Sequence, residues 1–413
     1  MLVLITIAAG LIGPGIISLL EALHSFNGGW EYLRLFRGFE GRAPAKFAPP
    51  VTLVLPCKGV DQGLKENLTA YFEQDYPDWQ ILLVTGDSSD PAVAVLEEVC
   101  ALYPDVASRI LCSGTTHQRS QKVHNLLHAL DFLRDGDEVL AFGDSDIRPA
   151  RDWLRHLVSP LEDSRVGVST GYRWYLPQKG NFASVLRSVW NAGIASMMNA
   201  KDCTFAWGGA MAIRRETFKE CRVADSWQSA LSDDYTISHA VHSRALSIRF
   251  QPPCLSFSHE DCNFRQLLDW SARQLSITRV YHPGLWRAAL VSQILNSLVL
   301  WGGMVILLLA LGYGDLRLRG IYLALAAVMG SIYVLGCIKG WMRLRAVLTL
   351  FPQHAEVLQR YRWAYVLWGP LASWVTLVGL VRSLFSREIE WRGVRYRMVS
   401  PEETIVLDPT TDD

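Results

Sequence analysis

The strongest constraint on the fold of this 413-residue chain is a set of apolar runs long enough to cross a lipid bilayer. The first run, residues 1–23, carries no charge before Glu21, and three more runs lie at 288–311, 320–338 and 363–385. Several nearly uncharged stretches of this length are rare in a soluble core. The sequence therefore predicts an integral membrane protein. The first run is expected to be a retained anchor, because it lacks the basic segment and cleavage site of a signal peptide.

Between the membrane runs lies a segment in which strand and helix patterns alternate. Apolar stretches of strand length occupy 51–56, 80–85, 106–112 and 138–142, with helical patterns between them. This alternation predicts an α/β fold with a parallel sheet whose faces are covered by helices. The expected parts are an anchor at 1–23, a soluble domain at 34–283, membrane helices at 288–385 and a tail at 386–413.

Composition narrows the class of partner. The 40 Lys and Arg residues balance 40 Asp and Glu residues, so the formal net charge is zero. A chain without a broad basic field is not expected to bind nucleic acid nonspecifically. The eight cysteines form no CxxC pair and no zinc spacing, and they are expected to be reduced thiols.

The most informative polar motif is Asp144-Ser145-Asp146, which directly follows the apolar stretch 138–142. Ligands of open parallel sheets bind at the carboxyl ends of the strands. Two carboxylates separated by one residue there can share a hard divalent cation that also takes phosphate oxygens. The alternative is an Asx turn that simply ends the strand. No P-loop pattern and no GxGxxG follows a strand, so phosphates are not held in either of those ways.

Three other aspartates are candidates on position alone. Asp87 follows the stretch 80–85, and Asp233 with Asp234 precedes a helical pattern at 235–242. Each has a plain structural reading as a turn or helix-cap residue. Adjacent carboxylates repel, however, so one of the pair is expected to have a raised pKa if the pair is buried, which suits a general base.

Together, several stretches resemble the ceramide glucosyltransferase family, within the family 2-like group of glycosyltransferases. Their order along the chain is also that of the family, and the likeness extends over roughly residues 1–397. The stretches are LPCKGVDQGLKENLTAYFEQDYP at 55–77, TGDSSDPA, QKVHNL at 121–126, GDSDIRP, WGGAMAIRRE at 207–216 and LSDDY. IEWRGVRY at 389–396 is similar to a stretch of related membrane glycosyltransferases.

The resemblance implies a GT-A fold and an inverting transfer from a nucleotide-sugar donor linked to UDP. Asp87 is then expected near the nucleotide base or ribose, and Lys122 and Asn125 are expected to help hold the donor. Asp144 would bind the donor and, with Asp146, the divalent metal, Mg²⁺ or Mn²⁺, on its diphosphate.

The same resemblance assigns the acceptor side of the reaction. Asp234 is expected to be the general base, with Asp233 as its carboxylate neighbour. The family's fourth signature, Q/R-x-x-R-W, aligns with the stretch that begins Arg273-Gln274, and both residues are counted with the catalytic group. Ser276 and Ile277 stand where the signature has Arg and Trp, and Arg279 is a candidate for the missing charge. This departure leaves open a branch that acts on a different lipid.

The favoured hypothesis is a membrane enzyme that transfers one sugar, expected to be glucose, to a hydroxyl of a ceramide-like lipid. Metal charge would help the diphosphate leave, and a carboxylate would take the proton of the attacking hydroxyl. A processive polysaccharide synthase and a transferase acting on another lipid, such as a hopanoid, are alternatives. A non-enzymatic scaffold and a transporter are least favoured, because the aspartates are retained and no membrane run has a central ionisable residue.

Basic residues predict the orientation in the membrane. Those at 34–46, after the first run, place the soluble domain in the cytosol. Four full crossings would put the tail outside, yet residues 387–397 are rich in arginine. We therefore expect the fourth run, interrupted by Gly369-Pro370, not to cross fully. The tail is then cytosolic, with Trp391 and Arg392 near the membrane-facing side of the active site.

Overall fold

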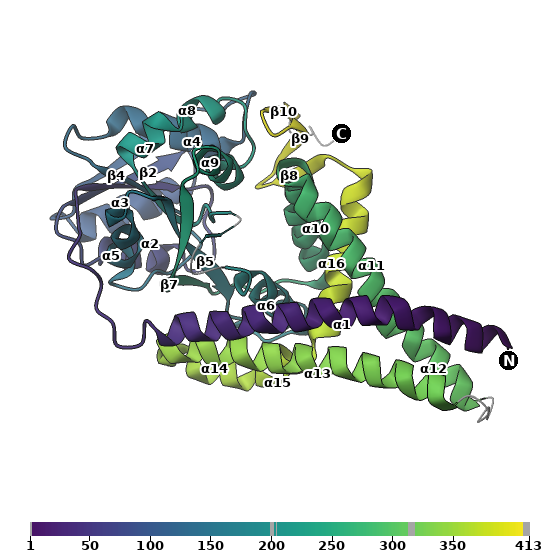
Figure 1. The fold of residues 1–413 in the computed structure, drawn as a ribbon. Helices are drawn as coiled ribbons and strands as arrows, with labels where there is room; N and C mark the ends of the chain where they lie inside the picture. The colour runs from purple at the N-terminus through teal and green to yellow at the C-terminus, as the bar shows by residue number, and fades with distance from the viewer. Residues whose placement is uncertain (1, 199–201, 204, 313–318, 408–413) are drawn as a thin grey trace. The chain divides into compact units, whose positions relative to one another are not determined.

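The computed structural model describes residues 2–198, 202–203, 205–312 and 319–407, and these form two compact units (Figure 1). The sheet unit comprises Gly38–Gln178, Met197–Asp261 and Ser386–Asp413. The helical unit comprises Met1–Arg37, Lys179–Ser196 and Cys262–Phe385. Each unit is therefore assembled from three separate stretches of the chain.

The sheet unit is built on a seven-stranded sheet in the order β3-β2-β1-β4-β6-β5-β7. Its strands are β1 Val51–Pro56, β2 Trp79–Thr85, β3 Ser108–Cys112, β4 Val139–Gly143, β5 Val166–Tyr175, β6 Ala210–Arg214 and β7 Ser247–Ser258. Strands β1, β2 and β4 are almost entirely buried, as expected for apolar runs covered on both faces. The predicted α/β fold class is confirmed.

One strand departs from the expected parallel sheet. β3, β2, β1 and β4 are parallel, but β6 runs antiparallel to both β4 and β5. Ala210, the first residue of β6, therefore pairs with Gly143, the last residue of β4. The reversal brings the loop before β6 to the carboxyl end of β4, where Asp144 follows.

Helices pack against the sheet and connect its strands. They are α2 Leu64–Phe72, α3 Ala92–Leu102, α4 Gln121–Ala129 with the 3-10 turn Leu130–Phe132, α5 Trp153–Val158 with the 3-10 turn Ser159–Glu162, α7 Arg215–Glu220, α8 Val223–Ser226 and α9 Asp233–His242. Tyr71 of α2 and Trp153 of α5 meet edge to face, with ring centroids 5.7 Å apart, in the core beside β1 and β4. Buried aromatic pairs of this kind fix how helices lie on a sheet.

The tail forms a second, three-stranded antiparallel sheet within the sheet unit. Its strands are β8 Glu388–Trp391, β9 Val394–Ser400 and β10 Glu403–Leu407, in the order β10-β9-β8. Arg392 and Gly393 connect β8 to β9, with φ angles of 53° and 74°. Two positive φ angles in a two-residue hairpin loop are the mark of a type I′ turn.

The helical unit contains the apolar runs. Its helices are α1 Leu2–Arg37, α6 Phe182–Ala195, α10 Phe264–Tyr281, α11 Pro283–Ser297, the π-helical turn Leu298–Gly302, α12 Gly303–Gly312, α13 Arg319–Leu350, the 3-10 turn Pro352–His354, α14 Ala355–Arg360, α15 Arg362–Leu367 and α16 Gly369–Phe385. The long helices α1 and α13 lie side by side along much of their length (Figure 1).

Three helical segments are long and apolar enough to span a membrane, namely Val3–Arg37, Pro283–Gly312 and Gly320–Leu350. The fourth apolar run differs, because its helix is broken between α15 and α16 beside Gly369-Pro370. α16 has 17 residues and is about 26 Å long, which is shorter than the roughly 30 Å hydrocarbon core of a bilayer. Within the described residues, three of the four predicted runs thus meet the length of a full crossing.

Candidate active site

The site is centred on the loop that follows β4. Arg173 of β5 donates from Nη1 to Asp146 Oδ2 at 3.0 Å and from Nη2 to Asp146 Oδ1 at 2.6 Å. The same Nη2 donates to Asp144 Oδ2 at 3.0 Å. The two carboxylates therefore converge on one cationic group. Their side chains keep 23% and 18% of their exposure, so the cluster is open on one side.

Aromatic rings hold Arg173 in this position. The guanidinium carbon lies 5.1 Å from the ring centre of Trp207 and 5.5 Å from that of Tyr175, and Nη1 also donates to the Tyr175 hydroxyl oxygen at 3.1 Å. Cation–π contacts restrain an arginine whose charge is partly removed from water. Arg173 is not among the residues predicted from the sequence, because its only signal is a charge inside the apolar strand pattern of β5.

Lys122 is the second cation of the site. It lies on α4, whose first turn is capped by Ser120, and its Nζ is 2.9 Å from Asp144 Oδ1 and 3.1 Å from Asp233 Oδ2. Burial would lower the pKa of Lys122, but Asp144, Asp233 and Asp234 outweigh burial and raise it. The lysine is therefore charged and joins the aspartate after β4 to the pair at the start of α9.

The two aspartates of α9 have different surroundings. Burial, with Asp234 and Asp144 nearby, raises the pKa of Asp233 to about 6, although Lys122 acts in the opposite direction. Asp234 is half-buried, and its Oδ1 accepts from Tyr235 N at 2.8 Å and from Ser232 Oγ at 2.5 Å. Its Oδ2 accepts from Gly208 N at 3.1 Å. Three donors thus fix the orientation of the Asp234 carboxylate.

The glycine pair before β6 allows these groups to approach one another. A Cβ atom on Gly208 would lie 2.3 Å from Asp233 Oδ2 and 2.9 Å from Lys122 Nζ. A Cβ atom on Gly209 would lie 2.6 Å from Asp144 Oδ2. Any side chain at either position would displace the charged groups, which explains the two glycines in the WGGA stretch.

Asp87 and Asn125, the other two residues expected to contact the sugar donor, have different surroundings. Asp87 is exposed after β2, where its Oδ1 accepts from Ser89 N at 2.8 Å in an Asx turn. Asn125 is buried on α4, donates to Val84 O at 3.0 Å and accepts from Ser113 Oγ at 2.7 Å. Its amide therefore connects α4 to the end of β2, and a direct contact with the donor stays a prediction.

The residues of the fourth signature belong to the other unit. Arg273 and Gln274 lie on α10 of the helical unit, and their place in catalysis remains a prediction. Arg279, the candidate for the missing charge, donates from Nη1 to the backbone oxygens of Ser383 and Leu384, the latter at 2.9 Å. Its guanidinium therefore caps the end of α16 within that unit.

The residues after β4 fit a divalent cation. In the described part of the chain, no three or more His, Cys, Asp or Glu side chains are grouped to hold a metal alone. Asp144 and Asp146, however, present hard oxygen atoms toward one shared cationic position. Mg²⁺ is commonly held by one or two carboxylates together with substrate phosphates. This donor set therefore suits a metal that arrives with a diphosphate.

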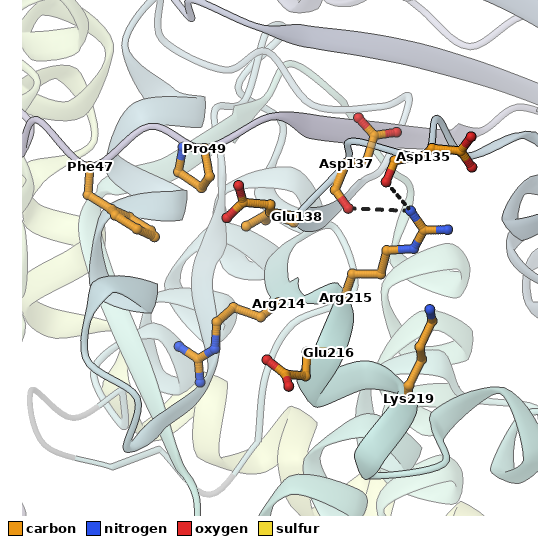
Figure 2. A pocket seen from close by; sticks show the side chains of 10 residues that line it. Phe47, Pro49, Asp135, Asp137, Glu138, Arg214, Arg215, Glu216 and Lys219 are labelled. Carbon is orange, nitrogen blue, oxygen red and sulfur yellow. Dashed lines mark hydrogen bonds between the residues drawn. The ribbon is translucent and has the colours of Figure 1, made fainter.

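A pocket of about 510 Å³ lies at the opposite end of the strands, beside the starts of β1 and β4 (Figure 2). It is lined by residues at the starts of β1 and β4, including Pro49 and Glu138, and by Arg214 at the end of β6. Arg215 donates to the backbone oxygens of Asp135 and Asp137 there (Figure 2). β4 begins beside the pocket and ends just before Asp144, so the pocket is separate from the charged cluster.

The sequence profile of glycosyl transferase family 21 matches residues 16–405, and the chain belongs to this family. Ceramide glucosyltransferase 1 of Caenorhabditis elegans is 21% identical over 232 residues, which are 55% of this chain and 49% of that protein. A ceramide glucosyltransferase of Gibberella zeae is 32% identical over 130 residues, which are 29% of this chain and 24% of that protein. The chain spans about half the length of these curated relatives, or less.

Two solved structures show weaker likenesses. A mannosyltransferase from Pyrobaculum calidifontis in complex with GDP-Man and Mn²⁺ is 19% identical with a TM-score of 0.49, covering 92% of this chain and 98% of that one. Glucosyl-3-phosphoglycerate synthase from Mycobacterium tuberculosis, with Mn²⁺, UDP-glucose and phosphoglyceric acid, is 13% identical with a TM-score of 0.37, covering 56% and 79%. Since both TM-scores lie below 0.5, the family membership rests on the sequence match alone.

The close approach at Gly208 gives a prediction about stability. We expect Gly208→Ala to lower the free energy of unfolding by about 1–3 kcal/mol, because the new methyl group overlaps Asp233 and crowds Lys122. Gly136→Ala is the matched control, since a Cβ atom there meets nothing within 4 Å. Thermal unfolding of both variants in detergent would measure the difference. Equal unfolding temperatures for Gly208→Ala and the unmodified protein would contradict the prediction.

Proposed function

We propose that this protein is a membrane-bound hexosyltransferase that moves one sugar, glucose, from a UDP-sugar to a hydroxyl group of a membrane lipid. The observation that carries the proposal is the cluster of Asp144, Asp146, Lys122 and Arg173 at the carboxyl end of β4, in a chain of glycosyl transferase family 21. Such a cluster suits the departure of an anionic diphosphate from a sugar.

The donor side of the reaction depends on the residues after β4. Asp144 and Asp146 would hold a divalent metal, Mg²⁺ or Mn²⁺, which when bound neutralises charge on the leaving diphosphate. Lys122 and Arg173 stay beside these carboxylates and place positive charge next to the phosphates. Asp87 is exposed after β2, which is separated from β4 by β1 alone. Because the carboxyl ends of these parallel strands lie at the same end of the sheet, Asp87 is placed to contact the nucleoside.

We assign the general base to Asp234. Its carboxylate is half-buried and oriented by three hydrogen bonds, whereas Asp233 is buried with one oxygen against Lys122. As the acceptor oxygen attacks the anomeric carbon, its proton passes to Asp234. The bond from that carbon to the diphosphate oxygen breaks as the new bond to the acceptor forms. A single displacement of this kind inverts the anomeric centre.

A lipid acceptor is supported by two independent observations. The chain has three helical segments long and apolar enough to span a membrane. The curated relatives are named ceramide glucosyltransferases, which supports a hydroxylated, ceramide-like lipid. Because Ser276 and Ile277 replace the Arg and Trp of the usual signature, a different hydroxylated lipid such as a hopanoid is the main alternative for the acceptor.

The orientation follows from the number of crossings and from the tail. We infer three crossings, with the sheet unit after the first and the tail after the third, so both lie on the same side of the membrane. The tail's own contacts support the same result, because Arg392 pairs with Asp61 inside the sheet unit. The basic residues at 34–46 support the cytosol as that side.

The proposed function is tested with the full-length protein in phospholipid nanodiscs. UDP-glucose, ceramide and Mn²⁺ are added, and the lipids are analysed by mass spectrometry. We expect one hexose on the lipid, and no product with Asp144→Asn or in excess EDTA. A panel of other hydroxylated lipids, including a hopanoid polyol, identifies the acceptor if ceramide fails. Long sugar chains made from the donor alone would establish a processive synthase instead, and full activity in EDTA would contradict metal dependence.

The role of Asp234 gives a second prediction. Asp234→Asn should lower the transfer rate by about 10²–10⁴-fold, because no carboxylate takes the acceptor proton. The affinity for UDP-sugar should change little, since the change leaves the Asp144 cluster intact. Asp233→Asn should be milder.

Asp225→Asn is the matched control for this prediction, because Asp225 is an exposed aspartate of the same unit, paired with Arg222. Rates at saturating donor and donor affinities by calorimetry separate the two effects. A variant at position 234 that lost donor affinity but kept its full rate at saturation would show that the base is another residue.

The topology gives a third prediction, made on a background without reactive cysteines. Ser400→Cys in β9 should resist a membrane-impermeant thiol reagent in intact cells and react after permeabilisation. A protein that keeps only the exposed native Cys112 of β3 should behave identically, because it reports the side of the sheet unit. Leu311→Cys near the end of α12 should react in intact cells. Labelling at position 400 without permeabilisation would restore four full crossings.

A further inference from the structure

The turn between β8 and β9 is docked on the loop that follows β1, although more than 300 residues separate them. Arg392 donates from Nη1 and Nη2 to the two Asp61 carboxylate oxygens at 2.8 and 2.6 Å, and from Nη1 to Lys58 O at 3.1 Å. Lys58 Nζ donates in return to Arg392 O at 2.7 Å. Two cationic side chains from distant parts of the sequence are thereby brought together.

The turn places its arginine in an uncommon backbone conformation. Type I′ turns favour Asn or Gly at both central positions, because both have positive φ. Arg392 has φ of 53°, a region that few residues other than glycine adopt. The Arg392 and Asp61 side chains are 34% and 29% exposed, and an ion pair open to water contributes little to stability. The arginine is therefore not explained by the stability of the hairpin.

The loop after β1 lies between the two loops expected to contact the donor. β1 is central, with β2 on one side and β4 on the other. Gly59 N donates to Asp90 Oδ1 at 2.8 Å, which joins the loop to the segment after β2 that carries Asp87. Asn67 Nδ2 of α2 donates to Ser145 O at 3.2 Å, which joins α2 to the loop after β4.

A second contact fixes the hairpin beside the cations of the site. The buried Tyr396 of β9 accepts at its hydroxyl from Gln121 N at 3.2 Å, one residue before Lys122. The hairpin therefore touches both the loop after β1 and the start of α4. Burial acts to lower the pKa of Arg392, but Asp61 and, more weakly, Asp146 and Asp144 raise it. The guanidinium is thus charged and within electrostatic reach of the site.

Arg392 also keeps hydrogen-bonding capacity. A guanidinium has five N–H groups, and the contacts to Asp61 and Lys58 O use three of them. Within the described residues, Nε–H and one Nη2–H donate to no protein group. Lys122 and Arg173, by contrast, are already committed to aspartates. The remaining N–H groups of Arg392 can donate to the oxygens of an incoming diphosphate while Asp61 still holds the guanidinium.

We propose that Arg392, held by Asp61 and Lys58, is part of the donor site and binds the diphosphate of the nucleotide sugar. The proposal rests on the proposed function, since it names a further residue for the same donor. The tail hairpin would then line one side of the active site. Arginine suits this role because its planar N–H groups match phosphate oxygens in pairs.

The test compares UDP with uridine as ligands of the full-length protein in detergent, at a fixed Mn²⁺ concentration, by calorimetry. Arg392→Asn removes the charge but keeps a residue that a type I′ turn favours. We expect it to weaken UDP binding by about 10-fold or more, because a hydrogen bond to a charged group is lost. Uridine binding and the unfolding temperature should be unchanged.

Arg397→Ala is the matched control, because Arg397 lies in the same hairpin and pairs only with Glu388 among the contacts described. It should bind UDP as the unmodified protein does. Equal loss of UDP affinity in Arg397→Ala, or none in Arg392→Asn, would overturn the assignment of Arg392 alone. If the unmodified protein binds neither UDP nor a UDP-sugar, the result contradicts the proposed function as well as the role of Arg392.

Discussion

The arrangement of the sheet unit depends on one electrostatic contact network, in which Asp144 lies between Lys122 and Arg173. Aspartates at the end of a buried strand lose much of their hydration, and such charges are tolerated only when they are paired. The two cations come from α4 and β5, so the network connects elements that are distant in sequence. It also creates the chemistry, because the same charges that hold the loop after β4 are those that a diphosphate and its metal would meet.

The backbone makes this concentration of charge possible. Strand β6 is antiparallel to β4 and β5, so the residues before β6 lie at the carboxyl end of β4 rather than at its amino end. Because Gly208 and Gly209 have no side chain, their backbone can lie close to Asp233 and Asp144. Gly208 N also orients Asp234, the proposed base. A single reversed strand therefore positions both halves of the proposed reaction, the leaving group and the acceptor proton.

The tail also brings together parts of the chain that are distant in sequence. Its three strands lie in the sheet unit, although the whole of α10 to α16 precedes them in the sequence. We infer that the tail and the sheet unit share one side of the membrane, which the proposed three crossings would satisfy. The short α16 and the break before it are consistent with that number. The pairing of Arg392 with Asp61 thus bears on topology as well as on the donor site.

The sequence by itself determined the features that arise from neighbouring residues. Apolar runs predict the buried strands β1, β2 and β4 to within a residue, and Asp144-Ser145-Asp146 marks the end of a strand. They also locate the long apolar helices, although α1 and α13 extend more than ten residues beyond the predicted runs. Only the tertiary structure decided which distant charges meet. Arg173 resembled any polar residue in a strand, the contact of Asn125 with the end of β2 had no local signal, and β6 is antiparallel. Contacts between remote elements depend on strand order and packing, which leave no periodic signal in the local sequence.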